Sequence, residues 1–309
     1  MTRVERPPGA PAVLPPQLAA EIEEARQRQW SDQLAPSDAD RGPPESGDQD
    51  PFAAEAQGGT GGYNIFWFEQ GDRLMRWQGR YRSSIISMPE DGRVPPFTEA
   101  ALARQDSMSL SHRGLGQFDN PEGRPLGERC LMSFGFNAGP PMLPNYFYNN
   151  YYMIVQTPDH VAIMTEMVHD TRIISLGEGD PLADHVRPWM GDSRGRWEGD
   201  TLVVETTNIN PAQLNDSRWF RGASGGFRVT ERFTRPGADA INYEFTVDDP
   251  DTYAGPWGGE VVFEASAQRI YEYACHEGNY GLANVLQGAR AQERTGTGSQ
   301  PDSQRENEN

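Results

Sequence analysis

The chain has 309 residues and a formal net charge of −18, from 45 acidic and 27 basic side chains. A surface of this sign repels phosphate backbones, so nucleic acids and anionic membranes are poor partners. All 27 basic residues are arginine, and the absence of lysine excludes pyridoxal-phosphate enzymes, P-loop nucleotidases and typical protein kinases, which need a lysine at the reacting group or the phosphates.

Both ends of the chain have the composition of poorly ordered segments. Residues 1–60 hold nine of the 25 prolines and carry a net charge of −6, from 5 arginines and 11 acids. Residues 291–309 are polar throughout. Because neither end has enough apolar side chains to offset the loss of chain entropy, we expect both to be largely disordered, apart from a helix over 16–34. A single β-barrel-like domain is therefore expected over 61–290.

The beginning of the sequence shows no apolar export signal and no cleavage-site pattern. No stretch approaches the ~20 apolar residues that a membrane-spanning helix needs. We therefore expect a soluble protein, cytoplasmic by the absence of a signal in this chain, or periplasmic if a signal peptide has been removed.

The first half of the expected domain predicts short strands and one long loop. Two strands are expected within 63–77 and a third over 81–88. Thr98 is placed to cap the beginning of a helix. The loop over 120–144 is rich in proline and glycine, and an irregular loop of this length inside a domain is usually functional or a lid.

The second half predicts hairpins. Turn residues at Pro158-Asp159, Glu198–Asp200 and Pro236–Asp239 separate pairs of apolar segments. A last strand is expected over 269–275, followed by a helix over 280–292. About nine to eleven short strands without alternating helices predict an all-β fold, either an antiparallel up-and-down barrel or a strongly curved sheet, lipocalin-like, with a few short helices.

The strongest candidate site is the segment His276-Glu277-Gly278-Asn279-Tyr280, which follows the expected last strand. It combines an imidazole, a carboxylate, an amide and a phenol within five residues. Histidine is the side chain most easily tuned for acid–base work near neutral pH. The alternative is a strand end in which His276 only caps the backbone.

Three further clusters supply candidate residues. In His169-Asp170-Thr171-Arg172 the aspartate can orient the imidazole, or it can form a turn salt bridge with Arg172. Arg194 can hold a carboxylate with two hydrogen bonds, or tie down a turn. The third cluster offers amide and phenol donors for a ligand oxyanion, or ordinary aromatic packing, and consists of Asn149, Asn150 and Tyr151.

No cofactor or metal site is expected. The chain lacks dinucleotide, Walker and flavin motifs, and its histidines show no spacing typical of a metal site. The two cysteines, Cys130 and Cys275, can form a disulfide worth up to ~4–5 kcal/mol or remain free thiols. We expect free thiols unless the protein is exported. Glu231 lies among apolar neighbours, so its carboxylate must be paired or have a raised pKa.

The tract GDSRGRWEGDTLVVETTN at 191–208, with HDTRII before it and YEYACHEGNYGL after it, resembles a large family of uncharacterised bacterial proteins. The similar region covers about 118–290 and includes RPLGERCL, GPPMLP and YNN. Many members of that family carry an export signal, which this chain lacks. The resemblance implies a shared fold but no established reaction. The lipocalin-like likeness is more distant and rests on the strand pattern alone.

Three functions are compatible with these patterns. The first is a cofactor-free acid–base enzyme, a lyase, dehydratase or isomerase acting on a small apolar or aromatic molecule. His276 or His169 would move the proton, Tyr280, Asn149 or Tyr151 would hold the oxyanion, and Arg194 would hold a substrate anion. The second is a non-catalytic binder or carrier of a hydrophobic ligand, which is favoured if no histidine faces the cavity. The third is a structural or interaction protein whose interior is filled by side chains. A homodimer is compatible with the first two.

Overall fold

The structure, a computed structural model, describes residues 2–33, 71, 73–110, 114–143, 148–177 and 179–296. The expected strand over 63–68 and the segments 34–60 and 297–309 lie outside the described residues. The elements, in chain order, are β1 Val13–Leu14, α1 Pro16–Gln33, β2 Arg76–Trp77, β3 Arg80–Arg82, β4 Ile86–Met88, α3 Glu99–Met108, η2 Pro121–Gly123, β5 Tyr152–Gln156, β6 His160–Thr165, η3 Met167–His169, β7 Thr171–Ser175, β8 Asp192–Glu198, β9 Thr201–Thr207, α4 Pro211–Asn215, β10 Arg228–Gly237, β11 Ala240–Asp248, β12 Trp257–Glu264 and α5 Tyr280–Thr295.

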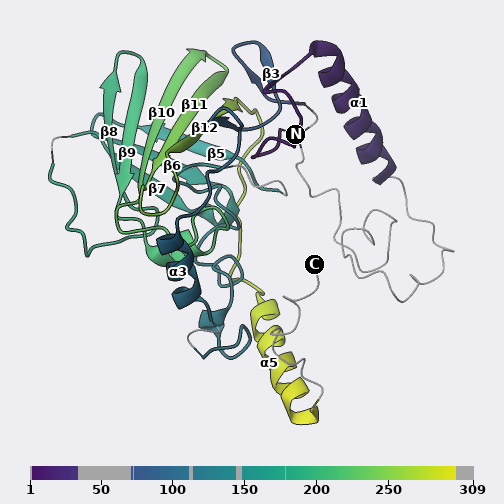
Figure 1. Ribbon diagram of the computed structural model, residues 1–309, viewed down its shortest axis with the longest axis vertical. Helices are drawn as coiled ribbons and strands as arrows, with labels where there is room; N and C mark the ends of the chain where they lie inside the picture. Colours follow the sequence, from purple (N-terminus) through teal and green to yellow (C-terminus); the bar gives the residue numbers. More distant parts are fainter. Residues whose placement is uncertain are drawn as a thin grey trace.

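A nine-stranded sheet forms the body, in the order β4-β12-β11-β10-β9-β8-β7-β6-β5, and a three-stranded sheet, β1-β3-β2, lies beside it. The mostly β architecture agrees with the prediction. Figure 1 shows β5–β7 behind β10 and β11, so the large sheet curls over on itself. The rings of Tyr152 on β5 and Phe263 on β12 lie 5.2 Å apart, although the two strands do not pair.

The expected up-and-down order is wrong at one junction. β7 and β8 run parallel, with Ile174 opposite Ser193 and Ser175 opposite Arg194. The segment 176–191 therefore carries the chain back along the sheet before β8 begins. The sheet thus consists of two antiparallel meanders, β5–β7 and β8–β12, joined by a short parallel contact.

The first residues of the chain belong to the folded body. The amides of Ile85 and Ile86 donate to the carbonyls of Arg3 and Val4, and Val13 pairs with Arg82. The expectation of a largely disordered extension is therefore wrong for residues 2–14, because their backbone completes the pairing beside β4. α1 agrees closely with the expected helix, and α5 continues past residue 290 to Thr295.

The inner face of the curled sheet is filled by side chains. Val229 and Phe233 on β10, Phe245 on β11 and Trp257 on β12 are buried there, together with Phe220 from the segment after α4. Phe220 stacks on Trp257 with ring centroids 5.6 Å apart. Burying such rings supplies most of the free energy that stabilises the curled sheet.

One ion pair lies inside this core. Arg172 on β7 is 2% exposed and Glu231 on β10 is 0% exposed. The two terminal guanidinium nitrogens of Arg172 donate to the two carboxylate oxygens of Glu231 at 2.6 and 3.0 Å, and the hydroxyl of Tyr243 donates to Glu231 at 2.8 Å. Glu231 is thus paired, as its apolar surroundings required. Because two strands separate β7 from β10, the pair fixes the curvature of the sheet from inside.

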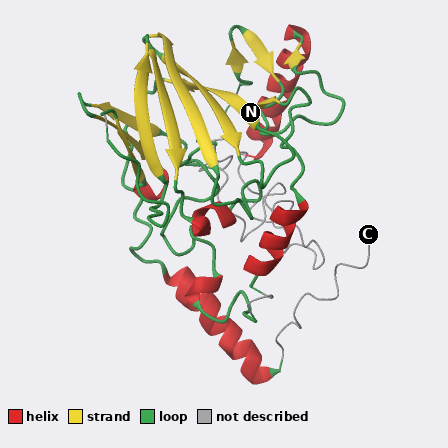
Figure 2. Cartoon of the chain, turned by 60° about the vertical axis from the view of Figure 1, so that its left-hand side comes forward, coloured by secondary structure: helices red, strands yellow, loops and turns green. Residues whose placement is uncertain are grey.

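A disulfide joins Cys130 to Cys275, so the expectation of free thiols is wrong. The bond ties residues 265–296 to the loop over 118–134, and Figure 2 shows α5 extending from the body at the end opposite the three-stranded sheet. Besides the disulfide, Arg290 donates to the carbonyl of Phe118 at 3.0 Å, and Asn279 donates to that of Glu128 at 3.1 Å.

Candidate functional site

Two grooves contain residues that the sequence singled out. The first, here called the β8 groove, has a volume of about 750 Å³. It lies on the outer face of β8 and β9, where alternation places Asp192, Arg194 and Arg196 on one side of the sheet. Glu205 opposite Arg194 and the loop residue Arg187 complete its polar lining.

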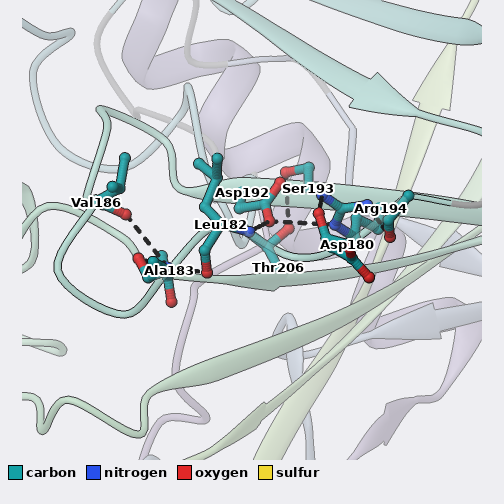
Figure 3. Close-up of polar contacts among 10 residues, drawn as sticks. Asp180, Leu182, Ala183, Val186, Asp192, Ser193, Arg194 and Thr206 are labelled. Atoms are coloured by element: carbon teal, nitrogen blue, oxygen red, sulfur yellow. Dashed lines mark hydrogen bonds and ion pairs between the residues drawn. The ribbon is translucent and has the colours of Figure 1, made fainter.

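The side chains at the end of the β8 groove hold the loop over 179–188 (Figure 3). The carboxylate of Asp192 accepts a hydrogen bond from the backbone amide of Leu182 at 2.9 Å. The side-chain amide of Asn208 donates to the carbonyls of Leu182 and Ala183, both at 3.1 Å. Arg194 donates to the carbonyls of Gly179 and Asp180 and to Asp192. The three guanidinium nitrogens of Arg194 are therefore engaged by the protein itself, which gives this residue a loop-anchoring role.

Gly191, the first residue of the tract 191–208, is required by its surroundings. Gly191 has a φ of +73°, and a Cβ there would lie 2.5 Å from the carbonyl oxygen of Thr207. Any side chain would displace β9 or the loop. The tract 191–208 thus has a clear structural reason for its pattern.

The second groove, here called the α5 groove, has a volume of about 670 Å³. Its apolar walls come from three parts of the chain that the disulfide brings together: the loop before β5, the segment 272–279 and the first turns of α5. These walls are Phe134, Tyr148, Tyr273, Ala274, Leu282 and Val285.

The rim of the α5 groove is acidic. Glu272 and Glu277 line it, whereas Arg124 is bound to Glu128 by two hydrogen bonds of 2.8 Å. The four charged side chains therefore sum to −2, one arginine against three glutamates. Such a groove attracts cations and repels anions, so it favours cationic or uncharged apolar molecules over anionic ones.

The segment 276–280 does not form the expected strand-end site. Residues 265–275 form no strand; β12, the strand before them, is paired with β11 on one side and β4 on the other. Glu277 and Asn279 line the α5 groove, but His276 and Tyr280 do not. His276 is exposed, and Tyr280 is 74% exposed.

The His169 cluster adjoins the same region. His169 lies in η3 with a φ of +46°, and its Nδ1 is 3.2 Å from the carbonyl oxygen of Tyr273, a wall of the α5 groove. Asp170 accepts a 2.8 Å hydrogen bond from the amide of Ser133. The disulfide-linked loop over 127–134 thus brings together two clusters that are about 100 residues apart in the sequence.

Asp170 has the perturbed titration typical of a functional carboxylate. Burial raises its pKa from 3.8 to about 6, although the hydrogen bond from Ser133 and the neighbouring His169 act in the opposite direction. Between these pH values the folded protein holds the proton at Asp170 more tightly than the unfolded chain does. The free energy of unfolding therefore falls as the pH rises through this range.

Replacing Asp170 by asparagine will raise the free energy of unfolding at pH 7 by roughly 1–3 kcal/mol, because the buried charge is removed while an oxygen remains to accept from Ser133. In the variant, the free energy of unfolding will also lose the fall between about pH 4 and pH 6 that the titration of Asp170 causes in the wild type. Urea unfolding at several pH values measures both effects, with the exposed Asp159→Asn as the control. A lower stability of Asp170→Asn at pH 7 contradicts the assignment.

The remaining predicted residues lie elsewhere. Asn149, Asn150 and Tyr151 are half-buried and line neither groove; the hydroxyl of Tyr151 donates to Gln268 at 3.2 Å. Arg172, a candidate for binding substrate or for a turn salt bridge with Asp170, is instead buried in the core, bonded to Glu231, and lines neither groove. Sequence reasoning missed Leu282 and Val285. Their spacing places them on one face of the expected closing helix, and this spacing is the signal that could have identified them.

Within the described residues, no group of three or more histidine, cysteine, aspartate or glutamate side chains is placed to hold a metal ion. None of the described helices is long and apolar enough to cross a membrane.

No protein-family model, no curated protein and no solved structure matches this chain. The resemblance to uncharacterised bacterial proteins stays a prediction from the sequence, and the grooves are the basis on which a function is inferred.

Proposed function

We propose that the protein is a non-catalytic binder of a small apolar or aromatic molecule, which is uncharged or cationic and which occupies the α5 groove. The observation that carries this proposal is the lining of the groove. Aromatic and aliphatic side chains form its walls, acidic side chains form its rim, and none of the described residues that line it is a histidine. Apolar walls with a few polar groups are typical of small-molecule sites.

The same lining argues against the acid–base enzyme as the first choice. A general base must lie within hydrogen-bond reach of the proton that it removes. His276 is directed to solvent rather than to the groove, and Arg194 serves the loop of the other groove. The candidate groups for proton transfer, oxyanion binding and anion binding thus do not converge on one cavity.

One observation keeps catalysis as the second candidate. Asp170 has a pKa of about 6, close to the pH at which an acid–base group works best, and His169 beside it touches the groove wall at Tyr273. An enzyme would convert a bound ligand, whereas a binder returns it unchanged. Mass spectrometry of a ligand extracted after prolonged incubation with the protein distinguishes the two.

N-phenyl-1-naphthylamine, a neutral aromatic probe, will bind the protein with an increase in fluorescence, and Leu282→Asp will weaken this binding at least tenfold. The new carboxylate lies in the apolar wall, and a tenfold change corresponds to about 1.4 kcal/mol. Ala283→Asp is the matched control, because residue 283 is exposed on the same helix and does not line the groove.

The charge of the rim gives a second readout. The anionic probe 1-anilinonaphthalene-8-sulfonate will bind more weakly than the neutral probe, and Glu272→Gln combined with Glu277→Gln will narrow that difference. Equal effects of Leu282→Asp and Ala283→Asp on the neutral probe would remove the α5 groove as the binding site.

A further inference from the structure

β5 is an open edge of the nine-stranded sheet. Within the described part of the chain, β5 pairs only with β6. The edge at the other end of the sheet is short and partly covered. β4 has three residues, and the amides of Ile85 and Ile86 beside it donate hydrogen bonds to the carbonyls of Arg3 and Val4. β5 therefore offers unpaired backbone donors and acceptors of the kind that another strand can satisfy.

The register identifies which backbone groups are free to pair. The amide of Thr157 donates to the carbonyl of His160, and the amide of Glu166 donates to that of Tyr151. In an antiparallel ladder the hydrogen-bonded pairs alternate with non-bonded pairs. The odd-numbered residues of β5 therefore bond to β6, and the amides of Tyr152, Ile154 and Gln156 point to the open edge.

The outer face beside this edge is apolar. Met153 and Val155 are 46% and 47% exposed, and Ile173 on β7 is 53% exposed. Val155 is opposite Ala162 on β6, which is in turn opposite Ile173, so these side chains form one continuous patch across three strands. Contiguous exposed apolar surface of this kind marks an interaction site.

Charge limits where two copies of this chain can meet. No residue of Tyr152–Gln156 is charged and none is proline, so the edge lacks the usual features that prevent strand pairing. Two copies of a chain with a net charge of −18 repel one another over most of their surface. This repulsion is weakest at the uncharged β5 edge and its apolar patch. Burial of the apolar side chains there also opposes it.

We propose that two copies of this chain associate through β5, antiparallel and about a two-fold axis at Ile154. Ile154 then pairs with itself in the partner copy, and Tyr152 pairs with the partner's Gln156. On the outer face Met153 packs against the partner's Val155. The interface is self-complementary, as a two-fold contact requires, and it joins the two nine-stranded sheets into one.

Sedimentation velocity over a range of protein concentrations tests this interface. The wild-type mass will rise with concentration from that of one chain to that of two. Val155→Lys will raise the dimer dissociation constant at least tenfold, because it places a charge in the centre of the apolar patch. Leu102→Lys is the control, since Leu102 is an exposed apolar residue on α3, away from the sheet edge.

A second variant separates backbone pairing from side-chain packing. Ile154→Pro removes an amide that faces the open edge but no hydrogen bond to β6, so it abolishes the dimer while the monomer stays folded by circular dichroism. Hydrogen exchange of wild-type protein provides an independent readout, with the amides of Ile154 and Gln156 more protected at high concentration. A wild-type mass that stays at one chain into the millimolar range overturns the proposal, and so does a Val155→Lys variant that dimerises like wild type.

Discussion

Replacing Glu231 by alanine will lower the free energy of unfolding by about 3–5 kcal/mol, because it leaves the guanidinium of Arg172 buried without a counter-charge. Burial alone would lower the pKa of Arg172, but Glu231 beside it holds the pKa above its usual value. The arginine therefore stays charged in the core. Removing its partner leaves a charge whose desolvation nothing offsets, and urea unfolding at neutral pH measures the loss.

The double variant Arg172→Met with Glu231→Leu separates the cost of an orphaned charge from the value of the pair. Since burying two ions is itself costly, replacing both by apolar side chains of similar size will recover most of the stability lost in Glu231→Ala. Glu198→Ala is the surface control, because Glu198 pairs with Arg196 and Arg232 on the exposed outer face. If Glu231→Ala is as mild as Glu198→Ala, the buried pair does not hold the sheet.

Converting Cys130 and Cys275 to alanine will lower the free energy of unfolding by about 4–5 kcal/mol in the chain-entropy model, since the bond closes a loop over a sequence separation of 145 residues. Apart from the disulfide, hydrogen bonds such as those of Asn279 and Arg290 hold the segment 265–296 to the body, and α5 has no buried residue. Limited proteolysis of the variant will therefore cut first within this segment.

Reduction of the wild-type disulfide will likewise lower the free energy of unfolding and expose the segment 265–296 to proteolysis. The same reductant will change neither property in the double alanine variant. Because Cys275 and the residues around it form one wall of the α5 groove, reduction will also weaken binding of the neutral aromatic probe. Unfolding midpoints that do not differ between oxidised and reduced protein would show that the hydrogen bonds of Asn279 and Arg290 suffice to hold the segment.

Local signals in the sequence predicted the hairpins well. Turn residues at 158–159 and 198–200 separate strands whose apolar residues alternate, and both hairpins form where expected. Thr98 caps α3 through a 3.1 Å hydrogen bond from the amide of Ala101. For Glu231 the sequence left two alternatives, a paired carboxylate or a raised pKa, and the structure shows the pairing with Arg172.

Relations between distant segments did not follow from the sequence. The alternation in 269–275 resembles a strand, but strand formation also needs a partner strand, and within the described residues this segment pairs with none. The parallel contact of β7 with β8 depends on how the core packs rather than on a turn. The two cysteines carried no information about their pairing, so the groove that the disulfide assembles from distant segments was not predictable.

The parallel junction has a consequence for the order in which the sheet assembles. Within β5–β7 and within β8–β12 each strand pairs with its neighbour in the chain, so both meanders close short loops. The pairing of Gly258 with Met88 and the contact between Arg172 and Glu231 join residues far apart in the chain, and closing such loops is slow. We therefore expect the two meanders to form first and independently, with their union and the addition of β4 as the rate-limiting steps of folding.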